Sequence, residues 1–335
     1  MLSIYPLNKS SHVKFSHPSA FFEVLQETIH QKVIPFSSAR AALVYGLRAL
    51  GLSRMDEILV PPFLSHCVLS ALSKTTFPVM TPSHRTKAIM VYHQFGYPQQ
   101  IKLLEEAAAK NEWKIVNNCV NAPFSSYENT KIIEWGDFAV VSFPKWYTCN
   151  LGGGLATANP QILQELDETY EKLCEAHINR SNWTFDTLLK TKENPSGIEE
   201  RFDVDAVYGI LPELVAFPSQ SYGLLPDTTQ KIEDDIDHRR RLFNLIQTRF
   251  PEKTPEIPEC DVVPFAIPIN GESKQLEHLA LKVKKELNIE IPLLHFDFSR
   301  NMLSPDYRKA LVIGCHQDWT EERITAICKI IENDG

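Results

Sequence analysis

Signals for membranes and for nucleic acids are missing from this chain of 335 residues. No apolar run approaches the roughly 20 residues that a membrane-spanning helix needs. The formal net charge is −8, whereas a nucleic-acid surface requires clustered cations. The densest basic run, His238–Arg241, lies in an acidic, helix-like segment, and we interpret it as a solvated face.

Motifs for metal, disulfide and nucleotide chemistry are missing as well. The seven cysteines form no CxxC pair and no metal-ligand spacing, and such a scattered set is typical of reduced thiols in a cytosol. No HExxH, GxGxxG or GxxxxGK[ST] pattern occurs. The first residues lack the charged start and apolar centre of a signal peptide. We therefore predict a cytoplasmic protein with no metal site and no membrane or nucleic-acid partner.

The sequence does contain alternating strand and helix patterns between about residues 37 and 160. Four apolar runs have the length of buried strands: 57–60, 88–93, 114–118 and 137–143. Helical patterns separate them, and in one of these Leu43, Leu47 and Leu50 share a face. The alternation favours a mostly parallel sheet flanked by helices, with ligands bound at the carboxyl ends of the strands.

The second half of the chain has a different pattern. We expect a helix over 160–176, an irregular region over 178–226 and a long charged helix over 227–250. The last part predicts two strands, 262–269 and 311–315, and two helices, 273–287 and 320–331. Ser273 is the expected N-cap of the first of these helices. The sequence thus predicts a large α/β domain over 1–230 and a smaller α+β domain over 231–335.

Ser37 and Ser38 precede the first helical pattern, in PFSSARAALVYGL (35–47). Serine is a favoured N-cap, and a helix N-terminus offers N–H groups and a positive dipole end to a phosphate. The plainer alternative is an N-cap that binds no ligand.

Lys145 directly follows a buried strand, in SFPKWYTCNLGGGLAT (142–157). A lysine in such a place can act as a Schiff-base nucleophile, and the three glycines after it allow close backbone approach or positive φ. The alternative is a surface lysine before a glycine-rich turn. Four histidines flank apolar runs without metal spacing, and we interpret them as packed residues: His66, His93, His295 and His316.

The order of five segments resembles one known family. These segments are SARAALVYGLRALGLSRMDEILVPPF, VYHQFGYP, KIVNNCVNA, GDFAVVSFPKWYTCNLGGGLAT and ALVIGCHQDWTEERITAI. They resemble motifs of the DegT/DnrJ/StrS-type sugar-nucleotide aminotransferases, which are fold-type I enzymes that use pyridoxal phosphate (PLP). The resemblance implies a fold-type I PLP-transferase-like α/β structure, and it leaves 178–226 unmatched.

The resemblance implies roles for particular residues. Ser38, Ala39 and Arg40 fall on the phosphate-binding helix start, and Ser142 is a further implied phosphate contact. Lys145 would form the internal aldimine with the cofactor. In the commoner pattern the lysine follows the serine by five residues and here it follows by three, so Tyr147 occupies the usual register. A divergent branch reads S-x-R-K-W, which SFPKW matches apart from Pro144.

Two further implied positions bear on the cofactor ring. His66 is a ring-stacking candidate, and the alignment there could slip towards Phe63. Asn118 falls on the aspartate that pairs with the pyridine nitrogen, and Asn121 falls on the usual glutamine. An aspartate keeps that nitrogen protonated and the ring an electron sink, whereas a neutral amide does not.

The sequence therefore supports two functional hypotheses. The first is a homodimeric, cytoplasmic, PLP-dependent aminotransferase that transfers an amino group from a donor such as glutamate to a keto-sugar nucleotide. The second is a non-catalytic or repurposed protein of the same fold, with a binding or regulatory role. Asn118 and the lack of a clear counterpart to the family's G-x-N segment favour the second hypothesis.

Overall fold

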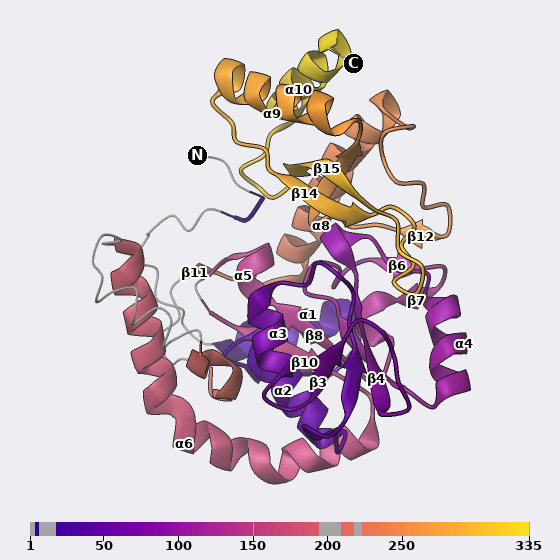
Figure 1. The fold of residues 1–335 in the computed structure, drawn as a ribbon. Helices are drawn as coiled ribbons and strands as arrows, with labels where there is room; N and C mark the ends of the chain where they lie inside the picture. Colours follow the sequence, from indigo (N-terminus) through magenta and orange to yellow (C-terminus); the bar gives the residue numbers. More distant parts are fainter. Residues whose placement is uncertain (1–3, 7–17, 150, 194–208, 218–222, 335) are drawn as a thin grey trace.

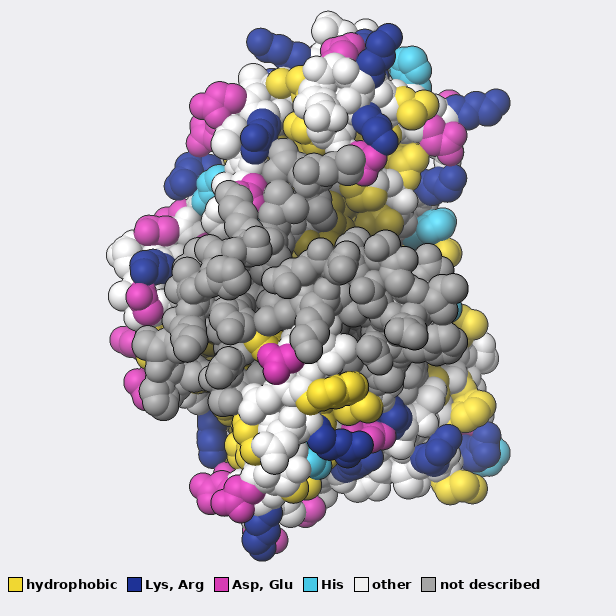
Figure 2. All heavy atoms as spheres, turned by 90° about the vertical axis from the view of Figure 1, so that its left-hand side faces the viewer, with side chains coloured by type: hydrophobic (Ala, Val, Ile, Leu, Met, Phe, Trp, Pro, Cys, Tyr) yellow, Lys and Arg dark blue, Asp and Glu magenta, His cyan; other side chains and the backbone are white. Residues whose placement is uncertain are grey.

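The computed structural model describes residues 4–6, 18–149, 151–193, 209–217 and 223–334. Among these residues, no helix combines the length and the apolar character required to cross a bilayer. On the face seen in Figure 2, cationic and anionic side chains of the described residues are interspersed, so no patch of a single sign is visible there.

A seven-stranded sheet forms the centre of the larger part of the molecule (Figure 1). Its order is β1 (Val33–Phe36), β10 (Gly153–Ala156), β8 (Phe138–Ser142), β5 (Lys114–Asn118), β4 (Thr86–Tyr92), β2 (Glu57–Leu59) and β3 (Phe77–Val79). The strands from β8 to β3 pair in parallel, and β10 runs antiparallel to both of its neighbours. The prediction of a mostly parallel sheet is confirmed.

Helices cover both faces of this sheet because its strands are apolar on both sides, which gives two clusters of buried side chains. The helices of this part are α1 (Pro18–Ile29), α2 (Ala39–Ala49), α3 (His66–Leu72), α4 (Ile101–Asn111), α5 (Phe143–Trp146) and α6 (Pro160–Glu193). In Figure 1, α6 curves around the lower and left edges of the molecule. The irregular region expected from 178 is wrong at its start, because α6 continues to Glu193.

A three-stranded antiparallel sheet forms the C-terminal part, in the order β13 (Ala266–Asn270), β15 (Tyr307–Gly314) and β14 (Leu293–Asp297). It is accompanied by α8 (Thr229–Arg249), α9 (Ser273–Leu287) and α10 (Glu321–Asp334). Ser273 is the first residue of α9 and not its N-cap, which is Glu272. Short elements complete the fold: β6 (Ser126–Tyr127), β7 (Thr130–Lys131), β9 (Thr148–Cys149), β11 (Gly223–Leu224), β12 (Cys260–Asp261), and the 3-10 turns η1 (Gln94–Gly96), η2 (Ile132–Glu134) and η3 (Leu211–Glu213).

The basic run on α8 is only partly a solvated face. Arg239 is fully buried; its Nε donates to Asp235 Oδ2 at 2.9 Å, and its guanidinium lies 4.3 Å from the ring centroid of Trp146. Arg240 pairs with Asp261 at the surface. The solvated-face interpretation is therefore wrong for Arg239, which joins α8 to α5 across the interior.

Glutamine side chains connect the large sheet to the C-terminal part. Gln94 Nε2 donates to the carbonyl oxygen of His295 at 2.5 Å, and Gln94 Oε1 accepts from the backbone N–H of Asp297 at 3.2 Å. Gln99 Oε1 accepts from the N–H of Met302 at 2.8 Å. We call these side-chain-to-backbone contacts the glutamine seam. The Gln94 contacts hold β14 beside the segment that follows β4, and the Gln99 contact holds the segment after β14 there.

Candidate functional site

A cavity of about 730 Å³ lies where β4, β5 and β8 end, beside the C-terminal sheet. The carboxyl edge of a parallel sheet is the usual ligand position in such folds, and the volume is typical of a small-molecule site. Seven of the eight residues predicted for the site line this cavity: Ser38, Ala39, Arg40, Asn118, Asn121, Ser142 and Lys145. The topology therefore brings together residues that are more than 100 positions apart in the chain.

The start of α2 forms one end of the cavity. Ser38 is the N-cap of α2, and its Oγ accepts from the N–H of Ala41 at 3.2 Å. Gly153 is needed here, because a Cβ on it would lie 2.3 Å from the nitrogen of Ala39. The helix N-terminus and the side chain of Arg40 together give this end of the cavity a positive character suited to a phosphate.

Lys145 lies on the single turn of α5 and is half-buried. Its Nζ is 4.9 Å from the ring centroid of Tyr5 and 5.6 Å from that of Phe265. Tyr147, in the commoner lysine register, is buried among apolar side chains, with its ring centroid 5.6 Å from that of Phe21. Burial raises the pKa of Tyr147 well above its usual value. Of the two positions, only Lys145 lines the cavity.

The adjacent asparagines of β5 have different environments because successive side chains of a strand point to opposite faces. Asn117 Nδ2 donates to the carbonyl oxygens of Ile132 and Trp135 at 2.5 and 3.1 Å, away from the cavity. Asn118 lines the cavity, although the residue is only 2% exposed. Its Oδ1 has no hydrogen-bond partner among the described residues. The side-chain oxygens of Asn117 and Asn121 also have no partner among the described residues, so it is the position of Asn118 in the cavity lining that indicates a ligand contact.

Asn121 and Ser142 complete the polar lining. Asn121 Nδ2 donates to the hydroxyl of Tyr92 at 2.6 Å. Burial is the main cause of a strongly raised pKa of Tyr92, so this hydroxyl stays protonated at neutral pH. Ser142 is the last residue of β8 and pairs with Gly153 of β10.

His66 does not occupy the position expected of a ring-stacking residue. It is the exposed first residue of α3 and is not part of the cavity lining. Phe63 lines the cavity instead, and its ring stacks on that of His295 with centroids 4.1 Å apart. The φ of Phe63 is +57°, a left-handed conformation that turns the chain at the cavity mouth. Of the two ring-stacking candidates, Phe63 therefore agrees better with the geometry than His66 does.

The other histidines are mostly packing residues. His93 is fully buried; its Nδ1 accepts from the N–H of Gln99 at 3.0 Å, and burial lowers its pKa to about 3. His316 is also fully buried. Among the described residues, no cluster of three or more His, Cys, Asp or Glu side chains could hold a metal ion.

Several lining residues carried no sequence signal. Tyr5 comes from the N-terminus, and Phe265 and His295 come from the C-terminal part. None lies in a motif that suggested a role in the site, and only the fold places them beside Lys145 and Asn118.

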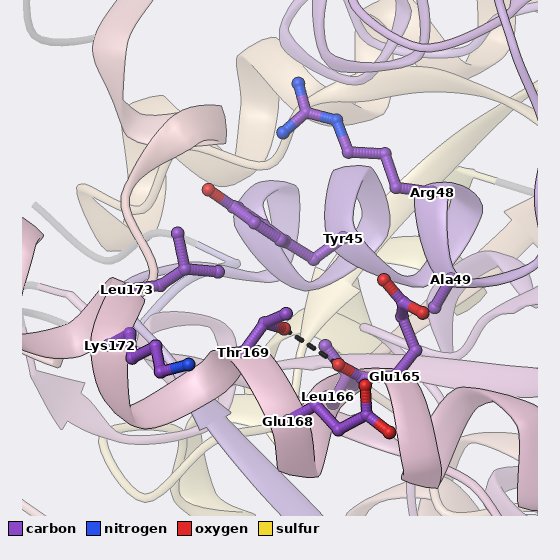
Figure 3. A pocket seen from close by; sticks show the side chains of 9 residues that line it. All are labelled: Tyr45, Arg48, Ala49, Glu165, Leu166, Glu168, Thr169, Lys172 and Leu173. Carbon is purple, nitrogen blue, oxygen red and sulfur yellow. Dashed lines mark hydrogen bonds between the residues drawn. The ribbon is translucent and has the colours of Figure 1, made fainter.

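A second pocket, of about 360 Å³, lies between α2 and α6 (Figure 3). Its charged side chains are of both signs and spread along its rim. The hydroxyl of Thr169 donates to the carbonyl oxygen of Glu165, and that of Tyr45 donates to the carbonyl oxygen of Glu213. These hydroxyls are thus satisfied by the fold itself, and the pocket has the character of a surface groove.

Comparisons with known proteins agree with this geometry. A family described as "Putative PLP-dependent aminotransferase" matches residues 22–187. GDP-perosamine synthase of Escherichia coli O157:H7 is 27% identical over 148 residues, 38% of this chain and 41% of that protein. The dTDP-3-amino-3,4,6-trideoxy-alpha-D-glucose transaminase of Streptomyces venezuelae is 27% identical over 170 residues, 44% of each chain. Each match thus spans less than half the length of the curated relative.

Solved structures show the same fold over nearly the whole chain. A DegT DnrJ EryC1 StrS aminotransferase from Brucella abortus has a TM-score of 0.67 at 14% identity, covering 96% of this chain and 91% of that one. NtdA from Bacillus subtilis, with bound cofactor PMP, has a TM-score of 0.66 at 16% identity, covering 96% and 78%. The chain thus resembles the DegT/DnrJ/StrS-type aminotransferases as a divergent relative, and its fold is theirs.

Proposed function

We propose that the cavity binds PLP and that the protein is an aminotransferase acting on a keto-sugar nucleotide. The observation that carries the proposal is the convergence of Lys145, Asn118 and the start of α2 on one cavity at the carboxyl edge of the sheet. The curated relatives named above are a perosamine synthase and a transaminase of nucleotide-linked sugars, which supports this substrate class.

The residues present fit the cofactor in three places. The first turn of α2 and Arg40 would hold its phosphate, with Ser142 beside them. Lys145 would take its aldehyde. The amide of Asn118 would meet the ring nitrogen, either accepting through Oδ1 or donating through Nδ2 after rotation. When bound, PLP supplies an electron sink for bonds to the α-carbon of the amino compound.

The chain's own contribution is to orient the reactants and to move protons. Of the lining residues that the structure describes, Lys145 alone carries an amine, so it is the group placed to carry a proton between the reacting carbons. The amide of Asn118, which would bind the ring nitrogen, carries no charge. A neutral hydrogen bond contributes about 1.3 kcal/mol less than a charged one, so affinity for the cofactor is about tenfold weaker than with a carboxylate.

The remaining details are part of the same proposal. Glutamate is the proposed amino donor, and the proposed assembly is a cytoplasmic homodimer. We also propose a domain boundary near residue 230, at the start of α8.

A specific observation favours a second candidate function, that of a non-catalytic protein which binds PLP or a nucleotide sugar. Among the described residues that line the cavity, there is no aspartate or glutamate. The lining therefore offers no carboxylate to keep the ring nitrogen protonated. A protein of this kind would bind the ligand and transfer no amino group.

The test is PLP titration followed by borohydride reduction, with peptide mass spectrometry to locate the fixed cofactor. We expect a visible absorbance band and a fixed adduct on Lys145 in the wild type. Both are expected to vanish in Lys145→Ala and to persist in the surface control Lys32→Ala, whose side chain is 53% exposed. Absence of a band at saturating PLP would refute the aminotransferase proposal. A fixed adduct without amino transfer to any keto-sugar nucleotide would favour the second candidate.

A further inference from the structure

A short piece of the N-terminus lies inside the candidate site. Ile4 is only 7% exposed and packs into the same apolar cluster as Phe265, while Tyr5 and Pro6 line the cavity. In Figure 1 this piece, coloured indigo, lies above α5 and below the C-terminal sheet. The buried Ile4 fixes the position of Tyr5 over the cavity.

The ring of Tyr5 faces the amine of Lys145. Lys145 Nζ lies 4.9 Å from the Tyr5 centroid and 5.6 Å from that of Phe265, within the range of cation–π contacts. The two rings are 5.5 Å apart and inclined by 56°, so the amine occupies the angle between them. A lysine side chain has about four rotatable bonds, and two rings beside its end restrict the directions in which the amine can point.

Core packing alone does not account for this contact, because Tyr5 is 44% exposed. Tyr92 lines the same cavity, and its pKa is raised first by burial and then by Tyr5. Tyr92 in turn accepts the hydrogen bond from Asn121. Tyr5 and Tyr92 thus both line the cavity, Tyr5 beside Lys145 and Tyr92 beside Asn121.

We propose that Tyr5 is a positioning residue for Lys145, holding the amine between two aromatic faces and directing it into the cavity. The effect of Tyr5 on the cofactor rests on the proposed function above, whereas its effect on Lys145 does not. Loss of the ring leaves Phe265 as the one aromatic neighbour of the amine within the described part of the chain. The lysine then samples more directions, becomes more accessible to solvent and captures an aldehyde less often.

The test compares Tyr5→Ala, Tyr5→Phe and Tyr5→Leu in the full chain. Tyr5→Phe keeps the ring and removes the hydroxyl, and Tyr5→Leu keeps an apolar cover without a π face. Phe77→Ala is the matched control, because Phe77 is an exposed aromatic of β3 outside the cavity. Two quantities are measured. The first is the rate at which acetic anhydride acylates Lys145 in the cofactor-free protein, relative to Lys32, and the second is the dissociation constant for PLP.

In Tyr5→Ala we expect relative acylation of Lys145 to rise at least twofold and the PLP dissociation constant to rise about fivefold. The latter corresponds to about 1 kcal/mol, the size of a partly exposed cation–π contact. Tyr5→Phe should stay within twofold of wild type in both measurements, and Tyr5→Leu should resemble Tyr5→Ala in PLP affinity.

The outcomes separate the two proposals. If wild type binds no PLP but acylation still rises in Tyr5→Ala alone, the proposed function fails and the positioning role stands. If wild type fixes PLP on Lys145 and Tyr5→Ala matches it in both measurements, the positioning role is overturned. Equal changes in Phe77→Ala, or unchanged acylation in Tyr5→Ala, overturn it as well.

Discussion

Replacing Asn118 by aspartate is the most informative single change in the site. The residue is 2% exposed, and its Oδ1 has no partner among the described residues. A carboxylate there loses hydration without gaining a hydrogen bond in the cofactor-free protein. Burial of this kind raises the pKa of an aspartate, by up to three to five units when burial is complete. The open cavity reduces this, and a rise of about two units corresponds to about 2.7 kcal/mol.

The raised pKa determines how the stability of Asn118→Asp depends on pH. The folded pKa of Asn118→Asp lies above the unfolded value near 4, so the variant is destabilised once the unfolded carboxyl ionises. The deficit relative to wild type is expected to be small below about pH 4, to grow up to about pH 6 and to stay near 2–3 kcal/mol above it. Saturating PLP should reverse it, because a protonated ring nitrogen pairs with the carboxylate. Affinity for PLP should increase about tenfold.

The assay is urea denaturation of wild type and variant at pH 4.5 and pH 8, with and without PLP. Asn117→Asp is the matched control, since its amide donates to two carbonyl oxygens away from the cavity. That variant should lose stability without recovery by PLP. If Asn118→Asp is as stable as wild type at pH 8 and binds PLP no more tightly, Asn118 does not face the cofactor and the reasoning is refuted.

Two further predictions concern buried charge. Burial lowers the pKa of His93 to about 3, so the neutral imidazole is compatible with the fold above pH 6.5 and stability is lost as the pH falls below that value. Between pH 7 and pH 5 we expect the wild type to lose about 2 kcal/mol of unfolding free energy, and His93→Gln to lack this loss. The measurement is urea denaturation of both proteins at both pH values. Equal pH dependence in the two proteins would contradict this. Arg239→Met should cost about 3–5 kcal/mol by leaving Asp235 buried and unpaired, whereas Arg240→Met, which removes a surface pair, should cost less than about 1 kcal/mol. Similar losses in the two variants would show that Arg239 is solvated in solution.

Local signals in the sequence were enough to predict the sheet and the polar ends of its strands. Apolar runs of strand length followed by polar residues put Asn118 and Ser142 at strand ends, and Lys145 one turn beyond. The continuation of α6 gave no such signal. Its buried face there includes Ser181 and Thr184, which occupy helical spacing without forming an apolar pattern.

Tertiary contacts account for what the sequence did not predict. Arg239 is buried because it stacks on Trp146 and donates to the carbonyl oxygen of Pro264, and neither partner lies near it in the chain. Tyr5 and His295 enter the cavity from opposite ends of the sequence. No local pattern of residue types carries that information, because it depends on how distant segments meet.

The glutamine seam has a consequence for sequence drift. Gln94 and Gln99 reach the C-terminal part only through the backbone atoms of His295, Asp297 and Met302. A side-chain substitution at any of these three positions leaves the N–H or carbonyl partner in place, unless the new residue is a proline at 297 or 302, which has no N–H. These backbone-directed hydrogen bonds are therefore retained when the side chains at the three positions change over evolutionary time. This is one physical route by which two chains with 14% identity retain a common fold over 96% of this one.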